Sequence, residues 1–115
     1  MKTYVISLPD ALTRQAALKQ HMDALKLDYE IIKAIDGRKD GFDTASYYNK
    51  HKRLRYFGRD LMNTEIACYL SHKKAIDTFL DSEYDLALIL EDDIQLREDF
   101  PEFIQPLKDL KDTFD

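Results

Sequence analysis

Tryptophan is absent from the 115 residues, and cysteine, glycine and proline are scarce, with one, three and three copies. The single Cys68 allows no intramolecular disulfide, which is typical of a reducing compartment. Few glycines and prolines, with 44% hydrophobic and 34% charged residues, exclude a disordered or low-complexity chain. No apolar run approaches the ~20 residues that cross a bilayer, and the start lacks a signal peptide's apolar core. We expect one domain, residues 1–115, in the cytoplasm.

The net charge of -5 argues against nucleic acid as a partner, but the basic residues are unevenly distributed. Five of them fall within residues 50–59, namely Lys50, Lys52, Arg53, Arg55 and Arg59. Such a segment could attract an anionic donor or acceptor, or the headgroups of a membrane at its inner, cytoplasmic face. A solvated, charged loop is the alternative interpretation.

Hydrophobic periodicity predicts alternating strands and helices. The first expected elements are a strand Thr3–Leu8, a helix from Ala11 to about Lys26 capped by Asp10, and a strand Tyr29–Ile35. An irregular segment Arg38–Asn63 follows, with helical turns near Thr44–Lys50. The last expected elements are a helix from a cap at Asn63 or Thr64 to about Leu80, a strand Leu86–Leu90 and a helix starting near Pro101. The first strand, helix and second strand form a βαβ unit with parallel strands. The order predicts an α/β, three-layer fold with a mainly parallel sheet.

The strand Leu86–Leu90 is continuous in apolar residues and ends in Glu91, Asp92 and Asp93. A continuous apolar run predicts a strand buried on both faces, in the middle of a parallel sheet. Ligands of open α/β sheets bind beyond the carboxyl ends of the strands. Clustered carboxylates repel one another unless a cation is present, and oxygen ligands favour Mg²⁺ or Mn²⁺. Alternatively, these residues cap or turn the chain where it reaches water.

Two further polar features allow a site or a structural reading. Arg14 could contact a ligand or fix the first turn of its helix, and His72 could be a packed core residue or a site residue. Cys68 and His72, one helical turn apart, could in principle hold zinc. No further cysteine and no HExxH pattern accompany them, so the sequence disfavours zinc.

Several segments taken together resemble glycosyltransferase family 25, which includes lipooligosaccharide and collagen galactosyltransferases. The segments are Tyr4-Val-Ile-Ser-Leu8, Arg14, Ala34-Ile-Asp-Gly37, Thr64-Glu-Ile-Ala-Cys-Tyr-Leu-Ser-His72 and Leu88-Ile-Leu-Glu-Asp-Asp-Ile94. The resemblance covers nearly the whole chain. The Ser-His pair of the long helix combined with the Glu-Asp-Asp strand end is more specific than either motif alone.

The resemblance implies a GT-A fold, a UDP-sugar donor, a Mn²⁺ or Mg²⁺ ion and inverting transfer of a hexose, galactose by preference. It implies a role in lipooligosaccharide or lipopolysaccharide biosynthesis with a lipid-linked saccharide acceptor. The acidic triplet would be the DxD-type motif, with Asp93 and Glu91 as metal ligands. The implied donor-binding residues are Ser7, Leu8, Arg14, Asp36, Gly37, Ser71, His72, Glu91 and Asp92.

The sequence also departs from the family pattern. Ser7 stands where the family suggests Asn, Ala67 where it suggests Gly, and Gln15 follows Arg14 where it suggests a second basic residue. Family members extend well beyond the acidic motif, so we expect a truncated, donor-binding half. The acceptor pocket and the general base would lie in the other half, and no catalytic residue is assigned.

The sequence leaves three alternative functions to compare with sugar transfer. A non-catalytic remnant would act as a self-associating or binding domain and would form a homodimer through exposed apolar surface. A receiver-like phosphotransfer domain would need a phosphorylatable Asp at another strand end, and a phosphatase would need one on the first strand, where Ser7 lies. No glycine-rich phosphate loop is present.

Overall fold

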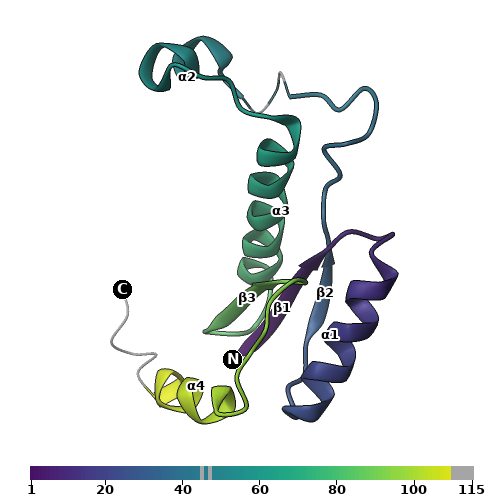
Figure 1. Ribbon diagram of the computed structural model, residues 1–115. Helices are drawn as coiled ribbons and strands as arrows, with labels where there is room; N and C mark the ends of the chain where they lie inside the picture. The colour runs from purple at the N-terminus through teal and green to yellow at the C-terminus, as the bar shows by residue number, and fades with distance from the viewer. Residues whose placement is uncertain (45, 47, 110–115) are drawn as a thin grey trace.

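The computed structural model describes residues 1–44, 46 and 48–109, which form a parallel sheet with helices (Figure 1). The strands are β1 (Lys2–Ser7), β2 (Glu30–Lys33) and β3 (Ala87–Glu91), and the helices are α1 (Leu12–Ala24), α2 (Lys50–Phe57), α3 (Asn63–Leu80) and α4 (Phe100–Asp109). The strand order is β2-β1-β3, and both pairings are parallel. The predicted α/β class with a parallel sheet is confirmed.

The central strand is β1, not the strand with the longest apolar run. Tyr4, Val5 and Ile6 are almost fully buried because β1 has a neighbour on each side and helices above and below. The prediction that the strand around Leu86–Leu90 lies buried in the middle of the sheet is wrong. Among the described residues β3 is an edge strand, and Ala87 to Leu90 are only half-buried. A run of apolar residues shows that a strand is hydrophobic, but it does not show which strands lie beside it, because the sheet topology sets the strand order.

The helices α1 and α3 cover opposite faces of the sheet (Figure 1). Tyr4 and Ile6 of β1 face α3, where they join a cluster with Ala75. Val5 points to the other face and packs with Leu18 and Met22 of α1. Successive strand residues point to opposite faces, so one short strand supplies both cores. This is the expected three-layer arrangement.

Two predicted helix caps are wrong. The residue before α1 is Ala11, which caps without a side-chain hydrogen bond, while Asp10 pairs with Arg38 instead. The residue before α3 is Met62 rather than Asn63 or Thr64, and its N–H donates to the Glu65 carboxylate at 2.8 Å. At α1 the predicted cap residue pairs with a residue of another loop, and at α3 the residue before the predicted cap takes the cap position.

The segment expected to be irregular contains α2, which begins later than the predicted turns. Asn49 caps it by accepting the Lys52 N–H at 2.9 Å, and Gly58 ends it in the left-handed region at φ 70°. Part of the predicted turn region, at residues 45 and 47, lies outside the described residues. Figure 1 shows α2 beyond the N-terminal end of α3, away from the sheet. No helix in the described part of the chain is long and apolar enough to span a membrane.

Candidate functional site

A cavity opens at the carboxyl ends of all three strands, against one side of α3. All of the predicted donor-binding residues line it: Ser7, Leu8, Arg14, Asp36, Gly37, Ser71, His72, Glu91 and Asp92. They come from the ends of β1, β2 and β3, from α1 and from α3. Their common location follows from the parallel topology, which brings the three strand ends to one edge. Their roles as donor contacts remain a prediction.

The Asp92 carboxylate ties β3 to β1 and α1. Its Oδ2 accepts a 2.6 Å hydrogen bond from the Ser7 hydroxyl, and its Oδ1 lies 3.3 Å from Nη1 of Arg14. Only 9% of the Asp92 side chain is exposed. Asp92 is therefore occupied by protein partners, and it orients the acidic turn that follows β3.

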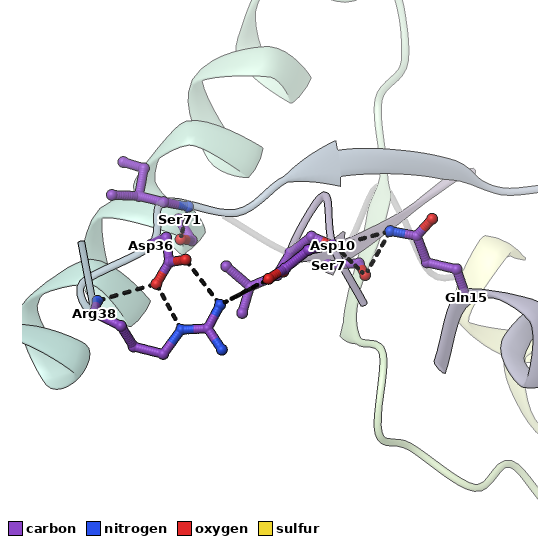
Figure 2. Close-up of polar contacts among 8 residues, drawn as sticks. Ser7, Asp10, Gln15, Asp36, Arg38 and Ser71 are labelled. Atoms are coloured by element: carbon purple, nitrogen blue, oxygen red, sulfur yellow. Dashed lines mark hydrogen bonds and ion pairs between the residues drawn. The ribbon is translucent and has the colours of Figure 1, made fainter. Parts of the chain in front are cut away.

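Two of the departures from the family pattern contact each other. The amide Nε2 of Gln15 donates to the Ser7 hydroxyl oxygen at 3.1 Å and to the Leu8 carbonyl at 2.9 Å (Figure 2). Gln15 thereby fixes the Ser7 hydroxyl, which donates its hydrogen bond to Asp92. Ser7 and Gln15 thus form one hydrogen-bonded unit, although the sequence gives no sign that the two positions are linked.

Ser71 and Gly37 join α3 to the segment after β2. The buried Ser71 hydroxyl accepts the Ile35 N–H at 2.9 Å and donates to the Ala67 carbonyl at 2.7 Å. A Cβ on Gly37 would lie 2.4 Å from the Asn63 carbonyl oxygen and 2.9 Å from the Ala67 Cβ. Only a glycine permits this close approach. Ser71 therefore has a structural role in addition to lining the cavity.

Arg38 bridges the loops after β1 and β2 at the rim of the cavity. Its Nη2 lies 2.8 Å from Asp36 and 3.2 Å from Asp10, and its Nε donates to Asp36 at 2.8 Å (Figure 2). The Arg38 side-chain bonds, followed by its backbone N–H, lower the pKa of Asp36 to about 2. Sequence reasoning missed Arg38 and Asp10. The spacing of Asp36 and Arg38 is typical of an Asx turn and could have indicated the local pair, but not its partner from the other loop.

Cys68, His72 and Glu91 form a second polar group on the cavity wall. His72 Nε2 lies 3.4 Å from Glu91 Oε1, and the Cys68 Sγ lies 3.9 Å from the same oxygen. Partial burial, together with the Glu91 charge, raises the pKa of the Cys68 thiol. His72 is half-exposed, so it is not a core residue. The sequence placed Cys68 beside His72, but Glu91 reaches them only through the packing of α3 on β3.

Asp93, the residue expected to lead metal binding, lies apart from this cavity. It lines a neighbouring cavity with Arg14, Leu18 and His21, whereas Glu91 lines the main one. The two carboxylates have the oxygen chemistry that Mg²⁺ or Mn²⁺ prefers. The metal assignment remains a prediction.

A parallel sheet whose three strand ends border one cavity, with helices on both faces, is the arrangement of an α/β domain. Comparison with protein families matches residues 1–115 to glycosyltransferase family 25 (LPS biosynthesis protein), and the chain belongs to this family. It is 29% identical over 96 residues to a glycosyltransferase 25 family member from Anopheles gambiae. That match covers 80% of this chain and 16% of the relative.

Proposed function

We propose that the main cavity binds the nucleotide-sugar donor of a glycosyltransferase. Membership of the family implies glycosyl transfer between a donor and an acceptor. The observation that carries the proposal is the gathering of all the predicted donor-binding residues around one cavity at the strand ends. The donor proposed is a UDP-hexose, galactose by preference, used with inversion on a GT-A type fold.

The charges at the rim of this cavity suit a diphosphate. Arg14 and Arg38 both line it, and both side chains are more than half exposed. Each is partly neutralised by carboxylates in the protein, so a bound diphosphate would compete with Asp92 for Arg14 and with Asp10 for Arg38. Bidentate contacts from Arg to phosphate oxygens are strong enough for this exchange.

A divalent Mn²⁺ or Mg²⁺ ion is part of the proposal, with Asp93 and Glu91 as its protein ligands. When bound, such an ion supplies positive charge that stabilises a diphosphate leaving group. The residues of this chain bind and orient the donor. Gln15 holds the Ser7 hydroxyl, Ser7 donates to Asp92, and Asp92 in turn positions the turn carrying Asp93.

The acceptor and the general base are not assigned to residues of this chain. The chain spans 16% of the length of the curated relative it matches, so the activity of the whole protein is itself a proposal. We propose that residues 1–115 form a donor-binding domain. The proposed acceptor is a lipid-linked saccharide of lipooligosaccharide or lipopolysaccharide biosynthesis, used in the cytoplasm at the inner face of the membrane.

Helix α2 is the proposed point of membrane contact. Tyr56 and Phe57 are 67% and 66% exposed, and Lys52 and Arg55 are exposed on the same short helix. A basic helix with exposed aromatic side chains suits the interface of an anionic membrane. Its distance from the sheet would leave the strand-end cavity accessible.

Calorimetry with UDP and Mn²⁺ tests the donor proposal. The wild-type chain is expected to bind UDP in a metal-dependent manner, and Asp93→Ala is expected to abolish this binding. Asp81→Ala, an exposed carboxylate after α3, serves as the matched control and should bind as the wild type does. Unchanged UDP binding in Asp93→Ala would defeat the metal assignment, and no UDP binding by the wild type would defeat the donor site.

The alternative function is a self-associating, non-catalytic domain. Tyr69, Ile76 and Leu80 are exposed along α3 at spacings that put them on one side of the helix. Such a stripe is suited to pairing with a second copy. Sedimentation discriminates the two functions, because a dimer that does not bind UDP supports the alternative and a monomer that binds it supports the donor site.

A further inference from the structure

We propose that Cys68, His72 and Glu91 bind a zinc-class divalent cation on the wall of the main cavity. The proposal shares Glu91 with the Mn²⁺ or Mg²⁺ site proposed above, but it does not rest on nucleotide binding, because Cys68 and His72 are not ligands of that site. They are a set of one sulfur, one nitrogen and one oxygen ligand whose atoms all lie within 4.8 Å of one another. They come from successive turns of α3 and from the end of β3.

The separations of Glu91 from the other two ligand atoms are close to those of a tetrahedral zinc site. With ordinary zinc bond lengths, nitrogen and oxygen ligands lie about 3.3 Å apart, and sulfur and oxygen ligands about 3.6 Å apart. His72 Nε2 and Glu91 Oε1 are 3.4 Å apart, and Cys68 Sγ and Glu91 Oε1 are 3.9 Å apart. Both separations from Glu91 Oε1 therefore lie within a few tenths of an ångström of the zinc values, and the three ligand atoms all lie within 4.8 Å of one another.

The hydrogen bonding of His72 leaves the correct nitrogen for a metal. Its Nδ1 lies 3.0 Å from the Cys68 carbonyl oxygen, which can only accept, so Nδ1 carries the hydrogen. In the neutral ring Nε2 then has a lone pair directed at Glu91. Two acceptors at this distance repel unless a cation lies between them. A backbone carbonyl on the other ring nitrogen is the usual support of a metal-bound histidine.

The ligand chemistry selects the class of ion. A thiolate and an imidazole favour zinc and cobalt over magnesium and manganese, which prefer oxygen ligands. A Cys68 thiolate and the Glu91 carboxylate together neutralise a divalent charge. If Nε2 instead carried a proton, His72 would donate a hydrogen bond to Glu91, and the position of Cys68 beside the same carboxylate would have no explanation.

The fourth coordination position would face the cavity. All three ligands line it, and Cys68 and Glu91 are exposed while His72 is half-exposed. Three protein ligands with one open position are typical of zinc sites that bind water or a substrate oxygen. The ligand class expected at the open position is water or an anionic oxygen.

Titration of the full chain with Co²⁺ under reducing conditions tests the site. We expect the absorption bands of tetrahedral cobalt and a thiolate-to-cobalt charge-transfer band. Cys68→Ser should lose the charge-transfer band, and His72→Gln and Glu91→Gln should each bind Co²⁺ at least about tenfold more weakly. His51→Gln, an exposed histidine on α2, is the matched control and should behave as the wild type does. Circular dichroism checks that each variant is folded.

Two results would overturn the proposal: an octahedral cobalt spectrum without the charge-transfer band in the wild type, or a band that survives in Cys68→Ser. The Asp93→Ala variant separates this site from the proposed donor site. It should retain the cobalt spectrum because Asp93 lies on another cavity. Cobalt binding without UDP binding would support this site and defeat the donor proposal, and the reverse pattern would do the opposite.

Discussion

The Ser7 hydroxyl donates a 2.6 Å hydrogen bond to the Asp92 carboxylate and so joins the last residue of β1 to the turn after β3. Ser7 is buried, and the Asp92 side chain is 9% exposed. The bond therefore holds a charged carboxylate at the edge of the core. If the bond were lost, water could not fully replace it, because the carboxylate is largely buried. The position of the acidic turn depends on this contact.

Ser7→Ala is expected to lower the free energy of unfolding by about 1–3 kcal/mol, because Asp92 loses its shortest hydrogen bond while staying largely buried. Urea unfolding measures the change. Ser46→Ala, which removes an exposed hydroxyl, is the control and should stay within about 0.5 kcal/mol of the wild type. Equal stability of Ser7→Ala and Ser46→Ala would contradict a structural role for the Ser7–Asp92 bond.

Gly37→Ala is expected to destabilise the chain by about 1–3 kcal/mol, because the new methyl group would overlap the Asn63 carbonyl oxygen at 2.4 Å. The overlap is with backbone, so a side-chain rotation cannot relieve it. Thermal unfolding followed by circular dichroism measures the loss. Asp40→Ala, an exposed position in the same loop, should leave the midpoint nearly unchanged. A similar midpoint for both variants would exclude close packing at Gly37.

The Asp36–Arg38 pair should make stability depend on pH in the acid range. Hydrogen bonds from Arg38 lower the pKa of Asp36 from 3.8 to about 2 in the folded chain. A lowered folded pKa contributes stability that is present above about pH 4 and is lost as the pH falls toward 2. Asp36→Asn should therefore be less stable than the wild type at pH 6, and the difference should shrink below pH 4. Urea midpoints at several pH values measure this difference in stability, with Asp28→Asn as the control variant. A difference between Asp36→Asn and the wild type that stays constant with pH would refute the role of the Asp36–Arg38 pair.

Helix α2 should bind vesicles that contain anionic lipid and should not bind purely zwitterionic ones. Reversing the charges of Lys52 and Arg55 to Glu should weaken binding by roughly tenfold or more, because each basic residue contributes about 1 kcal/mol at an anionic surface. Raised salt should have the same effect. Vesicle sedimentation measures the bound fraction, and Tyr69→Ser on α3 controls for exposed aromatics in general. Equal binding to both kinds of vesicle would count against this surface.

Local sequence patterns were sufficient for the order of the elements except for α2, which lies in the segment expected to be irregular. The βαβ start, the long helix α3 and the strand before the acidic triplet occur where they were expected, within a few residues. Local patterns failed to predict a helix cap and the central strand, because these depend on residues from other segments of the chain. Arg38 takes Asp10 away from the cap of α1, and the neighbours of β1 make it the central strand instead of β3.

The candidate site divides in the same way. The residues expected around the donor share one cavity because parallel strands bring their carboxyl ends to one edge. The separation of Asp93 from Glu91, the Gln15–Ser7 contact and the approach of Glu91 to Cys68 and His72 were not predictable. Each depends on side-chain directions that are set by packing between segments distant in the chain.

The sequence by itself determined the α/β class, the order along the chain of every strand and helix except α2, and the family, because periodicity and short motifs are local properties of the chain. Only the tertiary structure decided which strand is central, which carboxylates are occupied by protein partners and which face the cavity. Those outcomes depend on strand pairing and on helix packing across the sheet, since a side chain's partners there are many residues away.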